Sequence, residues 1–258
     1  MPVFSSDGVE IAYIDVASAN PASQKLPVLL IHGFASHLNM NWVSTSWVRT
    51  LTGAGHRVIA FDNRGHGASQ KLYDIADYGA PLMAQDALRL LDHLGIQRAH
   101  VMGYSMGARI SAFLVLHHPE RVASVVFGGL GINMVRGMAS GGNAIAEALE
   151  APSLADVTDT GGRVFRAFAE QTKSDLLALA ACMRSAREPI TVEAIGKIQR
   201  PVMVAVGTDD VVAGSGGELA ALIPGAHNFD IVGREHMKAV GDTTFKAAVV
   251  AFLAANPS

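Results

Sequence analysis

The chain has 258 residues, half of them hydrophobic, and carries a formal net charge of −3 with a pI near 6.3. This length and composition suit a single α/β domain with one sizeable core. Lysine and arginine do not gather into runs that would follow a phosphate backbone, which argues against nucleic acid as a partner.

Compartment and membrane association follow from three features. The single cysteine, Cys182, cannot form an internal disulfide, and we expect it to act as a small core side chain. The first residues lack a basic segment followed by an apolar one, so they do not resemble a secretory signal. The apolar runs at 122–132 and 247–255 are shorter than the roughly 20 residues that span a bilayer. We therefore expect a cytoplasmic protein without a membrane span.

The first half of the chain alternates strand-like and helix-like segments. Two short β-like runs, separated by the turn pair Asp7-Gly8, predict a hairpin. The run "LPVLLIHGF" is continuously apolar, as in a strand buried on both faces. Strands alternating with helices predict parallel βαβ units with helices on both faces of the sheet. The expected strands fall within 3–6, 10–17, 26–34, 57–67, 99–105 and 122–129, and the helices within 47–55, 80–95 and 106–118.

The alternation stops between about 130 and 199. This segment predicts helices over 144–151, 161–186 and 191–198 without a convincing strand. The alternation resumes with expected strands over 201–210 and 227–233 and helices over 214–223 and 243–256. We therefore predict a helical cap inserted at 130–199 into a core domain formed by 1–129 and 200–258.

The stretch "AHVMGYSMGAR" places Ser105 between two glycines where an expected strand turns into a helix. Gly103 and Gly107 lack the Cβ atoms that would collide in a sharp turn of this kind, which would lift the serine hydroxyl out at the sheet edge. The alternative is a glycine-rich turn whose serine only caps the helix that begins near Met106.

Together with other motifs, this stretch gives the chain a clear resemblance to the α/β-hydrolase fold family. The match covers nearly the whole chain and is least specific between about 130 and 199. The motifs that carry it, in the family's order, are "HGF" at 32–34, "DNRGHGAS" at 62–69, "GYSMG" at 103–107, "GTDD" at 207–210 and "GREHM" at 233–237. The resemblance implies a mostly parallel eight-stranded sheet with helices on both faces and a helical cap.

The resemblance also implies a catalytic triad in the chain order Ser, Asp, His. It assigns the nucleophile to Ser105, the acid to Asp210 and the base to His236. Adjacent Asp209 stays open as an alternative acid. The oxyanion hole would consist of the backbone amides of Phe34 and Met106.

The remaining polar residues of these motifs are expected to be structural. Asp62 and Arg64 would tie loops together beneath the site, and an anion pocket is the alternative for Arg64. His32 and Gly33 would shape the oxyanion loop. Asp86, on the helix before the nucleophile strand, is expected to be a solvated charge.

The predicted function is hydrolysis of a small or medium carboxylic ester, with a lactone or thioester also compatible. A serine at the nucleophile position disfavours the epoxide hydrolase branch, which uses aspartate. A cofactor-free perhydrolase, a C–C bond hydrolase and a small-molecule receptor remain as alternatives. We expect no metal or organic cofactor, since no ligands cluster with metal spacing. The expected partner is a small-molecule ester substrate, and the sequence leaves the oligomeric state open.

Overall fold

The computed structural model describes residues 1–137, 141–185 and 188–257. Within them, eight strands form one sheet in the order β1-β2-β4-β3-β5-β6-β7-β8. The hairpin strands β1 and β2 pair antiparallel, β2 pairs antiparallel with β4, and all other pairs are parallel. The predicted mostly parallel sheet is confirmed. The strands are β1 Val3–Ser6, β2 Val9–Val16, β3 Val28–Ile31, β4 Val58–Phe61, β5 Ala99–Tyr104, β6 Val122–Gly128, β7 Val202–Gly207 and β8 His227–Ile231.

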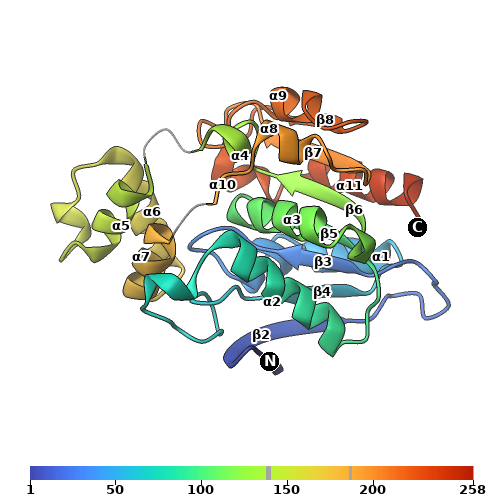
Figure 1. Cartoon of the computed structure of the whole chain (residues 1–258), viewed down its shortest axis with the longest axis horizontal. Helices are drawn as coiled ribbons and strands as arrows, with labels where there is room; N and C mark the ends of the chain where they lie inside the picture. Colours follow the sequence, from blue (N-terminus) through green and yellow to red (C-terminus); the bar gives the residue numbers. More distant parts are fainter. Residues whose placement is uncertain (138–140, 186–187, 258) are drawn as a thin grey trace.

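Helices cover both faces of this sheet (Figure 1). Strand β3 shows why, because its four residues are all buried and successive side chains point to opposite faces. Leu29 and Ile31 join a cluster with residues of α2 and α3, whereas Val28 and Leu30 join a second cluster with residues of α1 and α11. The core helices are α1 Trp47–Gly53, α2 Ala80–His93, α3 Met106–His117, α9 Gly216–Ala221, α10 His236–Ala239 and α11 Thr243–Ala255, with short turns η1 Asn39–Val43, η2 Ile75–Asp77 and η3 Pro119–Arg121.

The segment between β6 and β7 is helical in the part that the structure describes. Helices α5, α6 and α7 lie beyond the sheet, at the left of Figure 1. Residues 138–140 and 186–187 of the expected cap lie outside the described residues. The elements of this segment are α4 Asn133–Arg136, α5 Gly141–Glu150, η4 Leu154–Asp156, α6 Thr160–Gln171, α7 Leu176–Arg184 and α8 Val192–Ile195.

The single helix expected over 161–186 is two helices, so that prediction was wrong. Lys173 has a φ of 55°, in the left-handed region, and the N–H of Ser174 donates to the carbonyl oxygen of Ala169, which closes α6. The Asp175 side chain then accepts from the N–H of Ala178 and caps α7. The polar run at 170–175, with Asp175 directly before an apolar helix, signals this break in the sequence, and the single-helix prediction overlooked it.

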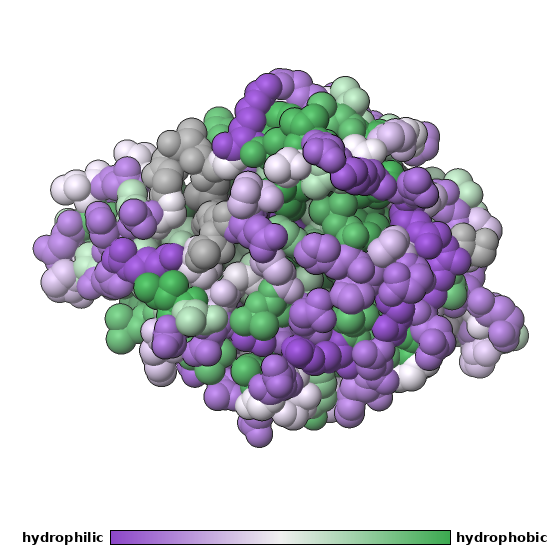
Figure 2. All heavy atoms as spheres, viewed as in Figure 1, coloured by the Kyte–Doolittle hydropathy of each residue, from purple (hydrophilic) through white to green (hydrophobic). Residues whose placement is uncertain are grey.

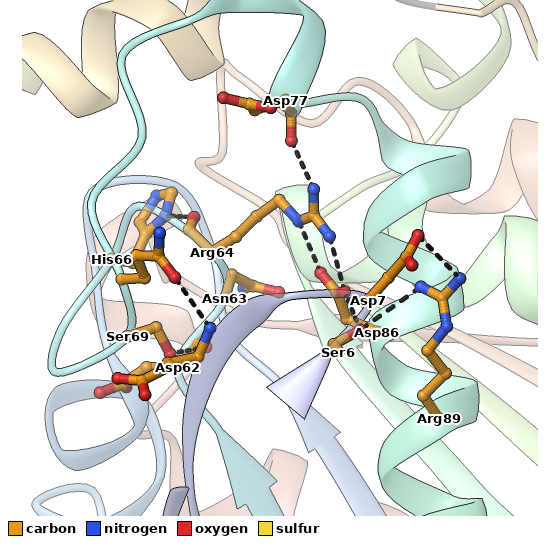
Figure 3. Close-up of polar contacts among 12 residues, drawn as sticks. Ser6, Asp7, Asp62, Asn63, Arg64, His66, Ser69, Asp77, Asp86 and Arg89 are labelled. Carbon is orange, nitrogen blue, oxygen red and sulfur yellow. Dashed lines mark hydrogen bonds and ion pairs between the residues drawn. The ribbon is translucent and has the colours of Figure 1, made fainter. Parts of the chain in front are cut away.

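A buried ion pair corrects the expectation for Asp86. Asp86 is 1% exposed and its carboxylate binds Arg64 through two hydrogen bonds of 2.7 and 2.8 Å. The hydroxyl of Ser6 donates to the same carboxylate, and Arg64 also donates to the carbonyl oxygen of Asp77 at 2.6 Å. Figure 3 shows that Arg64, in the loop after β4, contacts Asp86 on α2 and the backbone at Asp77. Arg64 ties loops together as expected, with Asp86 as its anion.

The surface contrasts with this interior. Figure 2 shows hydrophilic residues over much of the visible face, interrupted by separate hydrophobic patches. Scattered apolar patches of this kind are ordinary on a folded protein. In the part of the chain that the structure describes, none of the helices has the length and hydropathy needed to cross a bilayer.

Candidate active site

Ser105 lies at the turn between β5 and α3, as expected. Its backbone has φ 54° and ψ −113°, a strained conformation for a residue with a side chain. A Cβ at Gly107 would overlap the carbonyl oxygen of Ile31, and one at Gly103 would overlap the backbone of Gly107, so both positions require glycine. The Ser105 side chain makes no capping hydrogen bond with α3, which removes the alternative that it serves as a helix cap.

The three residues expected to form a triad come together at the carboxyl ends of β5, β7 and β8. The ring of His236 places Nδ1 2.7 Å from Oδ2 of Asp210 and Nε2 3.1 Å from Oγ of Ser105. An ionised carboxylate only accepts hydrogen bonds, so Nδ1 carries the proton and Nε2 is left to accept the serine hydroxyl. The arrangement can take a proton from Ser105 without moving the ring.

The structure separates the two adjacent aspartates. The Asp210 side chain is fully buried, and its second oxygen accepts from the N–H groups of Val212 and Ala213 at 2.8 and 2.9 Å. Asp209 is exposed, and among the described residues its side chain accepts only from the hydroxyl of its neighbour Thr208, at 3.2 Å. The contact with His236 therefore belongs to Asp210.

His236 begins the short helix α10 rather than lying in the loop that the sequence predicts. The hydroxyl of Tyr104, next to Ser105 in the chain, donates to the carbonyl oxygen of His236 at 2.5 Å. Burial, with Asp210 and Glu235 nearby, raises the pKa of Tyr104 well above its ordinary value, so the hydroxyl stays protonated. Sequence reasoning missed this contact, although Tyr104 lies inside the serine motif.

The backbone amides expected to form the oxyanion hole are those of Phe34 and Met106. Neither the N–H of Phe34 nor that of Met106 donates a hydrogen bond to another described residue. Met106 is the first residue of α3, where amides point out of the helix and the helix dipole favours negative charge. Phe34 lines both cavities at Ser105, and Met106 lines the larger one. These amides are free to receive an anion.

The loop that carries Phe34 is held from both sides. His32 donates from Nδ1 to the carbonyl oxygen of Gly33 at 2.8 Å and accepts at Nε2 from the N–H of Asn63 at 2.9 Å. Ala35 adopts a left-handed φ of 57°, and Thr172 Oγ1 lies 2.9 Å from its carbonyl oxygen. Thr172 is the residue at the end of α6, so the inserted segment contacts this loop directly. No local sequence pattern predicts that contact.

Two imidazoles buried in the same region are neutral at ordinary pH. Desolvation by complete burial lowers the pKa of His32 to about 3 and that of His66 to about 3. Their rings lie 5.3 Å apart, and the His66 ring packs edge-on against Phe34 at 5.8 Å. Because both rings are neutral at ordinary pH, they add no charge beside the amides of Phe34 and Met106.

Ser105 opens onto two cavities, one of about 260 Å³ and one of about 120 Å³. Phe34, Ser105 and Phe165 line both of them. His236 lines only the smaller one, whereas Met106 lines only the larger one. Among the described residues, no group of three or more His, Cys, Asp or Glu side chains could hold a metal ion.

Comparison with known proteins agrees with this fold. The family model described as alpha/beta hydrolase fold matches residues 27–191. A solved structure of a hydrolase from Pseudomonas aeruginosa PA01 is similar over 98% of this chain and 97% of its own, with 28% identity and a TM-score of 0.77.

Two curated relatives match shorter segments. Rhodomycin D methylesterase DauP from Streptomyces sp. (strain C5) is 40% identical over 107 residues, which are 40% of this chain and 35% of that protein. Epoxide hydrolase B from Mycobacterium tuberculosis is 36% identical over 114 residues, 43% of this chain and 30% of that protein. The segments that match this chain cover only 30–35% of the length of these curated relatives. With the family model covering more than half of the residues, the chain belongs to the α/β-hydrolase fold family.

Proposed function

We propose that the protein is a serine hydrolase that cleaves a small or medium carboxylic ester. The observation that carries the proposal is the hydrogen-bonded series from Asp210 through His236 to Ser105, whose hydroxyl lines two cavities. A serine hydroxyl is a weak nucleophile until an adjacent base takes its proton. Similarity to a methylesterase supports an ester as the substrate.

The reaction follows from the placement of the groups. Ser105 Oγ attacks the carbonyl carbon while its proton passes to Nε2 of His236, and the amides of Phe34 and Met106 hold the oxyanion. His236 then gives that proton to the alcohol oxygen as the C–O bond breaks, which leaves an acyl-serine. A water molecule, deprotonated by His236, attacks the acyl carbon, and His236 returns that proton to Oγ of Ser105 as the C–O bond to serine breaks and the acid leaves. Asp210 orients the imidazole throughout.

We further infer that residues 130–199 act as a cap over this site. Phe34 and Tyr78 of the core share a buried apolar cluster with residues of α5, α6 and α7. Phe165 of α6 and Met183 of α7 also line the cavities at Ser105. A cap of this kind would exclude bulk water from the acyl-enzyme.

The similarity to an epoxide hydrolase does not favour that chemistry. An alkyl-enzyme route to epoxide opening needs a carboxylate as nucleophile, and the residue at the strand-to-helix turn is Ser105. The hydroxyl with its imidazole base instead suits acyl transfer.

The test measures hydrolysis of p-nitrophenyl butyrate together with protein mass after treatment with a fluorophosphonate probe. Ser105→Ala should abolish both turnover and the mass increase. Asp210→Asn should lower kcat by about 10⁴-fold because the imidazole loses its orienting acceptor. Asp209→Asn is the matched control and should retain activity, since Asp209 does not contact His236. Turnover that survives in Ser105→Ala, or an equal loss in both aspartate variants, would refute the assignment.

A further inference from the structure

The two cavities at Ser105 are unequal, and their positions relative to the catalytic groups distinguish them. We call them the large arm, of about 260 Å³, and the small arm, of about 120 Å³. His236 and its neighbour Met237 line the small arm, and neither lines the large arm. The following inference rests on the proposed function, because it assigns each arm to one half of an ester.

The proton transfer decides the assignment. The imidazole must hand its proton to the departing alcohol oxygen, so that oxygen has to lie within hydrogen-bond reach of Nε2 of His236. The alcohol therefore extends into the small arm. The acyl chain leaves the carbonyl carbon in another direction, past Met106, whose amide holds the oxyanion, and extends into the large arm.

The large arm has the surface of an apolar binding site. Several of its side chains carry sulfur and adapt to an irregular ligand, since methionine is unbranched and polarisable. These residues are Met83, Met106, Met134, Cys182 and Met183.

Among the described residues that line the large arm, the polar side chains other than Ser105 already interact with acceptors of the protein. Arg109 donates to the carbonyl oxygen of Met134 at 2.8 Å, and Arg136 forms a 2.7 Å ion pair with Glu218. Asn133 and Ser185 likewise donate to backbone carbonyl oxygens. The arginines keep their positive charge, and apolar side chains form most of the remaining lining, so the arm suits an apolar chain.

We propose that the substrate is an ester of an apolar acyl chain with a smaller alcohol, bound with the chain in the large arm and the alcohol in the small arm.

Three isomeric esters test this proposal, because ethyl hexanoate, butyl butanoate and hexyl acetate contain the same atoms and differ only in how carbon is divided between the arms. We expect kcat/KM to fall in that order, by about tenfold or more from first to last, since each methylene in a fitting apolar pocket contributes to specificity. Equal rates or the reverse order would overturn the proposal.

Two substitutions test which arm is which. Val135→Phe narrows the large arm and should lower kcat/KM for ethyl hexanoate more than for hexyl acetate. Met237→Ala widens the small arm and should raise the relative rate for hexyl acetate. If either variant fails to fold, the isomer series with the native protein still decides.

Turnover of p-nitrophenyl acetate separates this inference from the proposed function. If that ester is hydrolysed and the isomer order is wrong, only the assignment of the arms fails. If no ester is hydrolysed, the proposed function fails and this inference with it.

Discussion

The buried ion pair between Arg64 and Asp86 leads to a quantitative prediction about stability. The two side chains are 4% and 1% exposed, and Arg64 donates both hydrogen bonds of a bidentate contact. The variant Asp86→Asn keeps the shape of the side chain but leaves the guanidinium charge buried without its anion. Removing one partner of a buried pair costs about 3–5 kcal/mol, because the remaining charge stays desolvated.

For a chain of this size, each kcal/mol lowers the melting temperature by roughly 2–4 °C, so Asp86→Asn should lower it by about 10 °C. Urea unfolding followed by circular dichroism at pH 7 would give the free energy of unfolding directly. The control is Asp15→Asn, which breaks a 2.7 Å pair with Arg57 whose side chains are 29% and 39% exposed. Water screens that pair, so the control should cost less than about 1 kcal/mol.

A double variant separates loss of the pair from loss of shape. Asp86→Leu combined with Arg64→Met removes both charges, and it should be more stable than Asp86→Asn alone because no unpaired charge stays buried. If Asp86→Asn costs no more than the Asp15 control, the pair is not desolvated and the reasoning from its burial is wrong.

Two further predictions concern pH and the oxyanion loop. Because the pKa of His32 and the pKa of His66 are lowered to about 3, protons bind the unfolded chain more tightly, so stability is complete above about pH 6.5 and falls as the pH drops towards 3. Each histidine should lower the free energy of unfolding by roughly 2 kcal/mol at pH 5 relative to pH 7. Urea unfolding at the two pH values measures this difference, and equal stability at both would contradict the prediction. Thr172→Val should lower kcat roughly tenfold at unchanged KM, a smaller loss than removing an oxyanion donor itself, whereas Thr172→Ser should retain the rate. A rise in KM at unchanged kcat would show that the hydroxyl only assists binding.

Local patterns in the sequence were sufficient for the alternation of strands and helices, whereas the eight-stranded sheet was predicted from the family resemblance. Hydrophobic runs such as 28–31 reflect strands buried on both faces, and the period of the hydrophobic residues distinguishes strands from helices. The sharp turn at Ser105 is also a local property, because the two glycines that it requires, Gly103 and Gly107, lie within two residues of the serine. The order of motifs added the family, and the family model confirms it.

The candidate site could be predicted only as a set of residues that would meet. The sequence named Ser105, Asp210 and His236, which lie up to 131 positions apart, and left Asp209 as an alternative. Their roles stay predictions until activity is measured. The geometry that distinguishes the two aspartates comes from the turn after β7, which buries one side chain and exposes the other.

The sequence by itself determined the alternating elements, the turn at Ser105 and the order of the candidate groups, because these depend on neighbouring residues. Only the tertiary structure decided that Asp86 is buried, that Thr172 contacts the loop of Phe34 and that two unequal arms meet at Ser105. Each of these depends on segments separated by 20 to more than 100 residues. The burial of a charge and the shape of a cavity are properties of packing between such segments, and no local pattern encodes them.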